Sequence, residues 1–450
     1  MKVTVIGSGS IFFTRQMVRG MATSEALRNA ELALVDIDER KCVQMGRFCQ
    51  KISDFYGANL KITYTTDRKA ALPGSDYVVL TFAQYNYHYR ETGTILAKNH
   101  GINLVSGETA GPSAVFRILR TVAPVLEVAR DIEALCPQAV VINYVNPTNV
   151  IGTALTRYTK LNTYAFCDGF YGGMNRRIFR LLGEPRDERD PLCTDLTHFD
   201  YKLGGLNHFT FLWGLTRGGE DLWGRVKDAL RAEAGAAEPG SHVRAEWDFC
   251  EAFDAWNPLG GHLVEYVRYF QGKGGDPQRD FVVSKWDLNK RIRWMKHVWF
   301  EIEACNAGKL PVGETMRDVG GANEMVADLI ESMTCDQGRT FTVNIRNGST
   351  ITNLPTDTHV EVLGRFYKDR VEVPPVGDLP RGLAGLMHPV IDEQELALEA
   401  AMTGNLETAI RAVACDPLVM SLSDARRLVH EHLALEETHV GNVWDTYWAA

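Results

Sequence analysis

The chain has 450 residues, a formal net charge of −9 and a sequence pI of about 5.8. This length exceeds what one simple core needs and favours two domains, or one elaborated α/β domain, with room for a buried cleft. Apolar residues make up 45% and charged residues 23% of the sequence, which excludes extended disorder. No cluster of lysine or arginine stands out, which argues against a nucleic-acid partner.

The cysteines and the apolar runs bear on the cellular compartment. Nine cysteines are scattered without a CxxC pair, at positions 42, 49, 136, 167, 193, 250, 305, 335 and 415. This odd number and spacing disfavour both a disulfide framework and a structural zinc site. The N-terminal apolar run is broken by SGS and then by Arg15 and Arg19, and no run reaches the roughly 18 residues of a membrane span. We therefore expect a soluble, cytoplasmic protein with reduced thiols and no membrane partner.

The N-terminal part alternates between strand-like and helix-like patterns. KVTVIG is a β-rich run that ends in glycine, a helical pattern follows over 12–26, and ELALVDID is a second strand, so that the three form a βαβ unit. Further elements are predicted as strands at 76–82, 139–145 and 162–169 and as a helix at 113–135. This alternation predicts an α/β fold with a Rossmann-like, doubly wound parallel sheet whose ligands sit at the carboxyl ends of the strands.

The pattern changes in the second part of the chain. Residues 187–215 indicate antiparallel strands, residues 231–242 an exposed linker of small residues, and residues 393–437 long helices. We therefore predict two domains, a Rossmann-like domain over 1–190 and an α+β domain over 191–450.

A turn rich in small residues joins the first strand to the first helix. Gly7 and Gly9, followed by Ser10, would let backbone amides approach a pyrophosphate at the positive end of the helix. Phe12 occupies the third glycine position of the GxGxxG fingerprint, so the loop alone is also compatible with a simple tight turn. Asp36 ends the second strand, where an acid holds the ribose hydroxyls of NAD and repels the 2′-phosphate of NADP, although a solvated strand-end carboxylate is the alternative. Together the loop and the acid predict NAD binding.

Polar residues also follow later strands. Asn143 and Asn146 lie in NYVNPTN, where Asn-Pro is a turn signal that also directs an amide into the cleft. Cys167 lies in YAFCDG at the end of a predicted strand, and His208 lies in GLNHF. Taken alone, the cysteine would be an inert buried thiol and the histidine a satisfied interior group.

Six motifs occur together in the order and spacing of one enzyme family. They are GSGS, GETAGPSAVFRILRT (107–121), NPTN (146–149), CDG (167–169), GLNHF (205–209) and NGSTITNLPTDTHVEV (347–362). On these motifs the chain resembles glycoside hydrolase family 4 from end to end. The resemblance implies a fold similar to that of the lactate and malate dehydrogenases. It also implies cleavage of glycosidic bonds with NAD and a divalent metal, usually manganese.

The resemblance further implies an oxidation-assisted elimination. NAD accepts a hydride from C3 of the sugar, the resulting ketone makes the C2 proton removable, and the leaving group departs from C1. Water then adds to the double bond and the hydride returns. Residues 1–190 would hold NAD, and residues 191–450 would contribute catalytic, substrate and oligomerisation surfaces of a homodimer or homotetramer.

Individual residues receive roles from the same resemblance. Cys167 and His208 would bind the metal, with O2 and O3 of the sugar completing the site, so that His208 also contacts the substrate. Tyr266 is the predicted base at C2, and His262 and Glu265 are alternatives.

Three further residues are predicted at the same place. Asp168 is the predicted acid toward the departing oxygen, the alternative being an Asx turn before Gly169. Asn146 is expected to touch the sugar ring or the nicotinamide ribose, and Asn143 is a second candidate substrate ligand.

The motif after the cysteine bears on specificity. CDGF matches no subgroup fully, because its aspartate is similar to the phospho-α-glucosidase branch and its glycine to the α-uronidase branch. The glycine-rich loop and GETAGPSAVFR look more like members acting on unphosphorylated sugars, so an unphosphorylated hexoside or uronide is expected. The alternatives are a 6-phospho-glycosidase of the same family, an NAD-dependent 2-hydroxy acid dehydrogenase and a nucleotide-sensing protein without chemistry.

Overall fold

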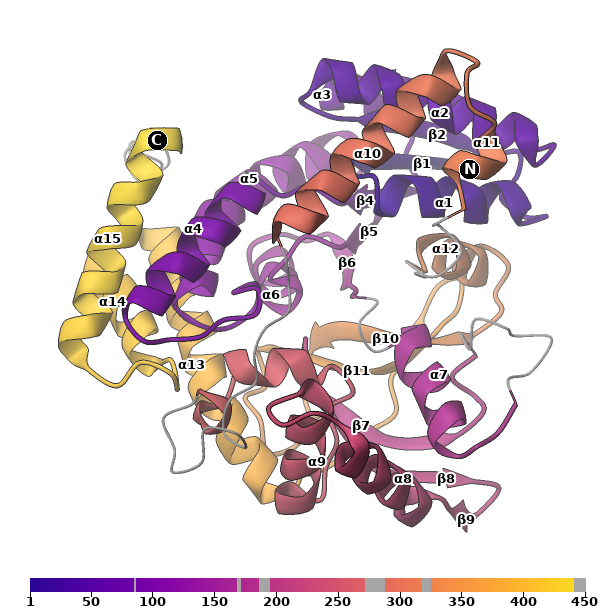
Figure 1. Cartoon of the computed structure of the whole chain (residues 1–450). Helices are drawn as coiled ribbons and strands as arrows, with labels where there is room; N and C mark the ends of the chain where they lie inside the picture. Colours follow the sequence, from indigo (N-terminus) through magenta and orange to yellow (C-terminus); the bar gives the residue numbers. More distant parts are fainter. Residues whose placement is uncertain (85, 168–170, 186–194, 272–287, 318–324, 441–450) are drawn as a thin grey trace.

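The computed structural model describes residues 1–84, 86–167, 171–185, 195–271, 288–317 and 325–440. The N-terminal residues lie in the upper part of Figure 1, and the C-terminal helices run along one side. None of the helices in these ranges is long and apolar enough to cross a membrane.

Six parallel strands form the N-terminal part of the sheet. They are β1 (Lys2–Ile6), β2 (Glu31–Val35), β3 (Lys61–Thr65), β4 (Tyr77–Leu80), β5 (Val140–Asn143) and β6 (Asn162–Ala165). Their order β3-β2-β1-β4-β5-β6 is that of a doubly wound nucleotide-binding sheet. Val3 and Val5 of β1 and Val78 and Val79 of β4 are fully buried, because helices cover both faces. The predicted Rossmann-like parallel sheet is confirmed.

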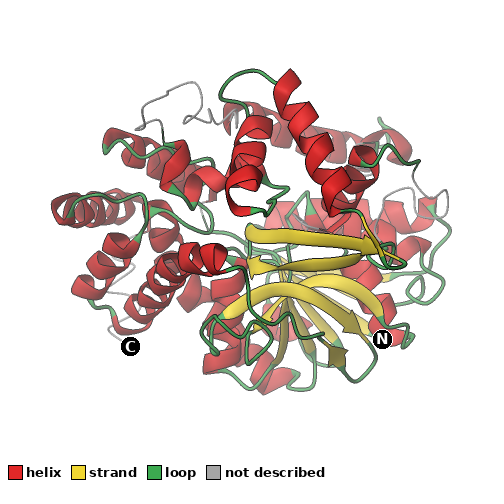
Figure 2. Cartoon of the chain, turned by 90° about the horizontal axis from the view of Figure 1, so that it is seen from below, coloured by secondary structure: helices red, strands yellow, loops and turns green. Residues whose placement is uncertain are grey.

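The helices of this part are α1 (Phe13–Thr23), α2 (Glu39–Phe55), α3 (Arg68–Ala71), α4 (Asn86–Asn99), α5 (Pro112–Leu135), α6 (Thr148–Tyr158) and α7 (Tyr171–Leu181). Alternate residues of β2 point to opposite faces of the sheet. Leu32 and Leu34 join an apolar cluster with α1 and α2, whereas Ala33 and Val35 join a second cluster with α5 and α6. Figure 2 shows the strands enclosed between helices in this way.

The sheet continues with antiparallel strands from the second part of the chain. These are β7 (Asp200–Leu206), β8 (Phe209–Arg217), β9 (Glu220–Asp221), β10 (Arg339–Arg346), β11 (His359–Phe366) and β12 (Val371–Glu372). β10 joins the parallel part by pairing Asn344 with Ala165 of β6, and the path goes on through β11, β7, β8 and β9. The predicted antiparallel strands therefore extend the same sheet.

The remaining helices are α8 (Trp223–Ala236), α9 (His242–Phe253), the 3-10 helices η1 (Gly260–Glu265) and η2 (Arg268–Phe270), α10 (Leu288–Asn306), α11 (Val312–Thr315), α12 (Val326–Thr334), α13 (Arg381–Thr403), α14 (Leu406–Cys415) and α15 (Leu422–Val440). The helical tail agrees with expectation. The predicted linker over 231–242 is wrong for its first half, which belongs to α8. Alanine and glutamate favour a helix there, and Leu230 and Ala234 anchor it in the core.

Helices from the second part pack against the first part. In Figure 1, α10 crosses over the N-terminal strands and helices, and Asn306 at its end donates to the Gln44 carbonyl oxygen on α2 at 2.8 Å. α12 packs so closely on α1 that a Cβ at Gly20 would meet Ala327. These contacts and the shared sheet cross the predicted boundary at residue 190, and the division into two domains stays a prediction.

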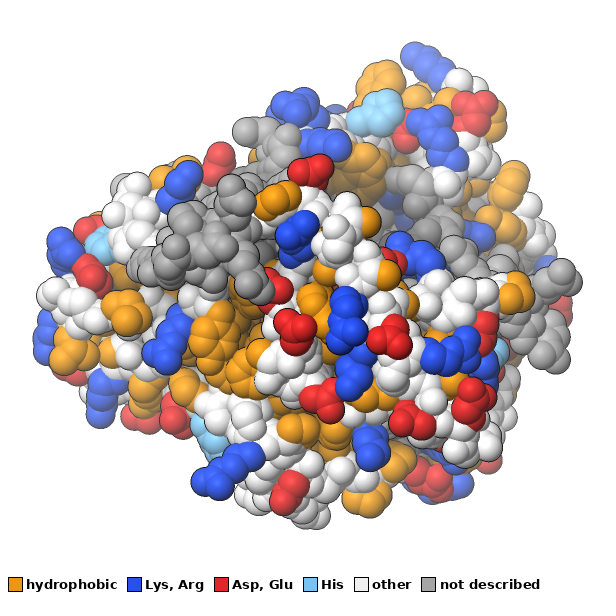
Figure 3. All heavy atoms as spheres, turned by 60° about the horizontal axis from the view of Figure 1, so that its bottom comes forward, with side chains coloured by type: hydrophobic (Ala, Val, Ile, Leu, Met, Phe, Trp, Pro, Cys, Tyr) orange, Lys and Arg blue, Asp and Glu red, His pale blue; other side chains and the backbone are white. Residues whose placement is uncertain are grey.

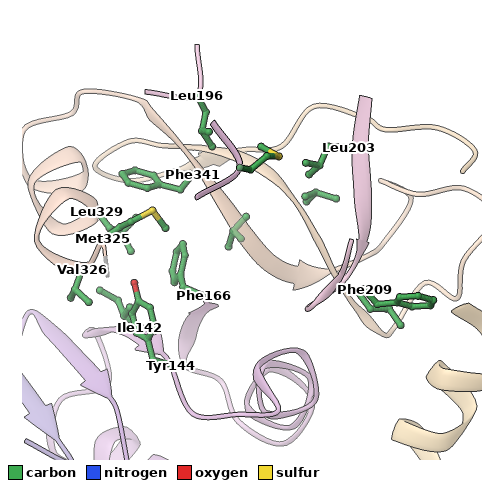
Figure 4. Close-up of a cluster of buried hydrophobic side chains, with 14 of the residues drawn as sticks. Ile142, Tyr144, Phe166, Leu196, Leu203, Phe209, Met325, Val326, Leu329 and Phe341 are labelled. Atoms are coloured by element: carbon green, nitrogen blue, oxygen red, sulfur yellow. The ribbon is translucent and has the colours of Figure 1, made fainter. Parts of the chain in front are cut away.

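One apolar cluster joins the two parts of the sheet. Figure 4 shows Tyr144 and Phe166 from the parallel part beside Met325, Leu329 and Phe341 from the second part. This packing fixes the carboxyl ends of β5 and β6 relative to the antiparallel strands.

The surface is mixed in charge on the side seen from below. Among the described side chains in Figure 3, basic and acidic groups are interspersed. The described side chains on that face therefore form no extended basic patch.

Candidate active site

A large cavity of about 1280 Å³ lies at the carboxyl ends of the parallel strands. Gly7, Gly9 and Asp36 line one end of it, and Cys167 and His208 line the other. In a doubly wound sheet this edge is where ligands bind, because loops and helix N-termini converge there. We refer to the two ends as the nucleotide end and the metal end.

The nucleotide end brings the backbone unusually close to its surroundings. Gly7 has φ +95°, and a Cβ there would lie 2.7 Å from Phe82 N. A Cβ at Gly9 would lie 2.8 Å from the Asp36 carboxylate, to which the Gly9 amide donates at 2.7 Å. Ser10 also lines the cavity. The loop is therefore a cradle that only glycines permit, and it fits the close approach of a pyrophosphate.

Two residues distant in sequence meet at the metal end. Cys167 lies two residues beyond β6, and His208 lies in the turn between β7 and β8. The Cys167 Sγ atom is 3.1 Å from His208 Nε2. The sheet order β6-β10-β11-β7 brings the two strand ends together across intervening strands.

The backbone of His208 is held in a conformation that side chains rarely adopt. Its φ is +63°, in the left-handed region. Neighbours fix the turn: Asn257 donates to the His208 carbonyl oxygen at 3.0 Å, and Tyr266 donates to the Asn207 carbonyl oxygen at 3.0 Å. Beneath the turn, the Glu361 carboxylate accepts a hydrogen bond from Asn207 at 2.9 Å. Such a strained residue persists where the surroundings determine its position, as they do here.

Burial keeps both histidines of the metal end neutral. The rings of His208 and His262 stack with their centroids 4.6 Å apart. Burial lowers the pKa of His208 to about 4 and that of His262 to about 3. A neutral imidazole has the lone pair that metal ligation requires.

A cluster of charged residues borders the same end. The Glu108 carboxylate is 2.8 Å from Arg90 and 3.4 Å from Arg117. Burial alone would raise the pKa of Glu108, but the two guanidinium groups lower it to about 2. Arg117 also donates to the Asn146 carbonyl oxygen at 3.2 Å. Neither the arginines nor Glu108 had been singled out from the sequence, although Glu108 and Arg117 lie within the motif at 107–121.

The two predicted substrate-binding asparagines, Asn146 and Asn143, differ in whether they line the cavity. Asn146 lines the cavity, and its Oδ1 atom accepts from the Thr148 hydroxyl group at 2.7 Å. Asn143 is fully buried, and both polar atoms of its side chain bond to the Val145 backbone at 3.1 Å. The structure therefore brings Asn146 to the cavity wall but not Asn143, which instead fixes the end of β5.

The three candidate bases also differ in position. His262 lines the cavity, and its Nδ1 atom is buried with no hydrogen-bond partner among the described residues. Tyr266 has no exposed surface, and its ring stacks on Phe209 at 4.5 Å. The Glu265 carboxylate accepts hydrogen bonds from the amides of Ser106 and Gly107, and it does not line the cavity. Of the three, His262 is the one that lines the cavity, while the role of Tyr266 as base stays a prediction. The predicted acid, Asp168, lies outside the described residues.

The metal end fits a divalent cation with two protein ligands. A thiolate and an imidazole are the donors that first-row transition metals prefer. The described residues contain no group of three or more His, Cys, Asp or Glu side chains that could hold a metal ion. Cys167 and His208 would therefore leave coordination positions open for oxygen ligands from a substrate. Their role as metal ligands stays a prediction.

Curated proteins of similar sequence are glycosidases. The chain is 27% identical over 432 residues to an alpha-galactosidase of Bacillus subtilis, covering 92% of this chain and 93% of that protein. It is 26% identical to the 6-phospho-beta-glucosidase of Escherichia coli (99% and 97% covered) and 25% identical to an alpha-galacturonidase of Thermoanaerobacter italicus (96% and 95% covered).

Solved structures show the same fold. A 6-phospho-alpha-glucosidase from gut microorganisms in complex with NAD and Mn²⁺ matches with a TM-score of 0.81 at 20% identity, covering 97% of this chain and 98% of that one. The 6-phospho-beta glucosidase of Thermotoga maritima with NAD and glucose-6-phosphate matches with a TM-score of 0.79 at 22% identity, covering 98% and 99%.

Two family models match nearly the whole chain. They are Family 4 glycosyl hydrolase over residues 2–184 and the Family 4 glycosyl hydrolase C-terminal domain over residues 203–419. The chain therefore belongs to the family 4 glycosyl hydrolases.

Proposed function

We propose that this chain is a glycosidase that uses NAD and a divalent metal, most simply Mn²⁺, to cleave an O-glycosidic bond. One observation carries the proposal: the Cys167 and His208 pair faces the same cavity as Gly7, Gly9 and Asp36. A dinucleotide and a metal-bound sugar would thus bind next to each other in one cavity. The similar glycosidases, and the relative solved with NAD and Mn²⁺, support the same assignment.

The residues of the nucleotide end bind and orient the cofactor. Asp36 would accept hydrogen bonds from the ribose hydroxyl groups, while the lack of side chains at Gly7 and Gly9 would let the pyrophosphate approach the loop before α1 closely. A carboxylate at this position repels a 2′-phosphate, which favours NAD over NADP. When bound, NAD supplies hydride acceptance and return at C3 of the sugar, and the cation polarises the sugar hydroxyl groups.

The residues of the metal end hold the sugar and move protons. Cys167 and His208 would coordinate the cation. The side-chain amide of Asn146 would donate a hydrogen bond to the sugar or to the adjoining ribose. For removal of the C2 proton there are two candidates. Tyr266 is proposed from the family resemblance, and His262 from its place on the cavity wall. Each proton transfer contributes typically about 10²- to 10⁴-fold in rate.

Asp168 is proposed as the acid that protonates the departing oxygen. It directly follows Cys167 in the sequence, and its assignment comes from the family resemblance.

For the sugar we propose an unphosphorylated hexoside or uronide, with a 6-phospho-glycoside as the alternative. Relatives of both kinds match over nearly their whole length. Arg90 and Arg117 line the cavity at the metal end, where they lie beside Glu108, and guanidinium groups are suited to bind a sugar carboxylate. Their position supports the uronide among the unphosphorylated candidates.

The test is turnover in deuterated water. The protein with NAD and Mn²⁺ is incubated with aryl galactosides, aryl galacturonides and aryl 6-phosphoglucosides, and the released sugar is analysed by NMR. We expect deuterium at C2 of one sugar class and no net NADH. Stoichiometric NADH without release of the aryl group would instead identify a dehydrogenase of hydroxy acids.

A further inference from the structure

Thr109 lies against the ring of His208 on the side away from Cys167. It belongs to the loop that precedes α5, and it is 99 residues from His208 in the sequence. Its Oγ1 atom is 3.1 Å from His208 Nδ1, and its side chain is 1% exposed. The two ring nitrogens of His208 therefore have different neighbours, a hydroxyl group at Nδ1 and a thiol at Nε2.

The position of the proton on the ring decides what His208 can bind. A neutral imidazole carries one proton, and the nitrogen without it offers the lone pair for a cation. For Nε2 to face a cation beside Cys167, the proton must lie on Nδ1 and needs an acceptor. Among the described residues, Thr109 is the side chain that an Nδ1 proton meets.

Other residues hold the backbone of the same turn. The Tyr266 hydroxyl group donates to the Asn207 carbonyl oxygen at 3.0 Å, and Asn257 donates to the His208 carbonyl oxygen at 3.0 Å. The backbone of His208 is therefore fixed independently of Thr109, which contacts the ring.

Two distant helices hold Thr109 in place. Gln394 of α13 donates to the Thr109 carbonyl oxygen at 2.7 Å. Asn149 of α6, the last residue of NPTN, donates to Gln394 Oε1 at 2.6 Å. All three residues are buried, where a lost hydrogen bond leaves a polar group unpaired.

We propose that Thr109 is a positioning residue that accepts the Nδ1 proton of His208 and so leaves Nε2 free to bind the cation, with Gln394 and Asn149 holding Thr109 in register. This inference rests on the proposed function, because it takes His208 as a metal ligand. It gives a structural role to Thr109 of the GETAG motif and to Asn149 of the NPTN motif.

The experiment compares Thr109→Val, which keeps the shape and removes the hydroxyl group, with Thr109→Ser, which keeps the hydroxyl group. Mn²⁺ binding to the full chain with NAD is measured from the EPR signal of free Mn²⁺, and NAD binding by calorimetry. We expect Thr109→Val to bind Mn²⁺ about 10- to 100-fold more weakly, as for other outer ligands of metal sites. Thr109→Ser should stay near the wild-type affinity, and both variants should bind NAD normally.

The outcomes separate this inference from the function on which it rests. If the wild type binds Mn²⁺ and Thr109→Val binds it equally well, Thr109 does not position His208, although the proposed function stands. If Thr109→Ser is as weak as Thr109→Val, packing and not the hydroxyl group is responsible, and the inference is wrong. A wild type that binds no divalent cation with NAD contradicts both. Should Thr109→Val fail to fold, Gln394→Met takes its place, with a weaker loss of Mn²⁺ affinity expected and normal affinity contradicting the network.

Discussion

The nucleotide end of the cavity is built from one βαβ unit, whereas the metal end is built from segments far apart in the chain. Gly7, Gly9 and Asp36 lie within the first 36 residues, and adjacent parallel strands hold them. Cys167 and His208 meet only because β10 and β11 lie between their strands. The nucleotide end therefore depends on local backbone geometry, and the metal end depends on the packing of the whole sheet. Substitutions at the two ends should separate NAD binding from metal binding.

The largest effect is expected for Cys167→Ser. Loss of a thiolate ligand should weaken Mn²⁺ binding more than about 100-fold, beyond what outer ligands contribute, and should abolish turnover. NAD affinity should not change, because the nucleotide end is separate. Cys335→Ser, at an exposed cysteine, is the matched control and should behave as the wild type. Full activity of Cys167→Ser would remove this cysteine from the site.

The substitution Tyr266→Phe tests whether Tyr266 removes the C2 proton of the sugar. If Tyr266 is the base, exchange of the C2 proton should fall by about 10²- to 10⁴-fold while Mn²⁺ affinity changes little. The Asn207 carbonyl oxygen also loses its partner, so the free energy of unfolding should fall by about 1 to 3 kcal/mol. NMR in deuterated water and urea unfolding measure the two effects. Unchanged exchange of the C2 proton would instead favour His262 as the base, and His262→Gln is the variant that tests this.

Asp36→Ala is the counterpart at the nucleotide end. Removing the predicted acceptor for the ribose hydroxyl groups should weaken NAD binding by about 10- to 100-fold, since hydrogen bonds to charged groups contribute about 1.5 to 3 kcal/mol each. Mn²⁺ affinity should remain close to that of the wild type. Calorimetry measures both, and Glu39→Gln, an exposed acid on α2, serves as the control. Normal NAD affinity in Asp36→Ala would place the ribose elsewhere.

The last prediction concerns two buried acids that line neither end of the cavity, Asp416 and Glu393. Burial raises the pKa of Asp416 to about 7, and that of its neighbour Glu393 is also raised by burial. Between about pH 4 and 7 the folded protein thus keeps a proton that the unfolded chain releases. The free energy of unfolding should therefore fall as pH rises through this window, by up to about 1.4 kcal/mol per pH unit for one proton.

Asp416→Asn should flatten this dependence, and thermal unfolding from pH 4 to 8 measures it. Asp392→Asn, at an exposed acid beside the pair, should keep the wild-type slope. Equal slopes in all three proteins would mean that Asp416 carries no proton at neutral pH.

The sequence by itself determined the elements whose signals are local. Two glycines between a strand and a helix, with an acid at the next strand end, predicted a loop that the structure shows as a tight cradle around Gly7, Gly9 and Asp36. The strand end at Cys167 followed from the same kind of pattern, whereas His208 was predicted only to lie in a region of antiparallel strands. Their pairing, however, came from the family resemblance and not from periodicity.

Only the tertiary structure decided which distant side chains meet. The contact of Thr109 with His208, the pair of arginines around Glu108 and the return of α10 to α2 join segments that no local pattern connects. In the structure, Asn143 and Tyr266 are buried and hydrogen-bonded. The first half of the predicted linker over 231–242 is helical. Periodicity reports whether a residue faces the core, but the partner that it meets there depends on how the sheet and its covering helices pack.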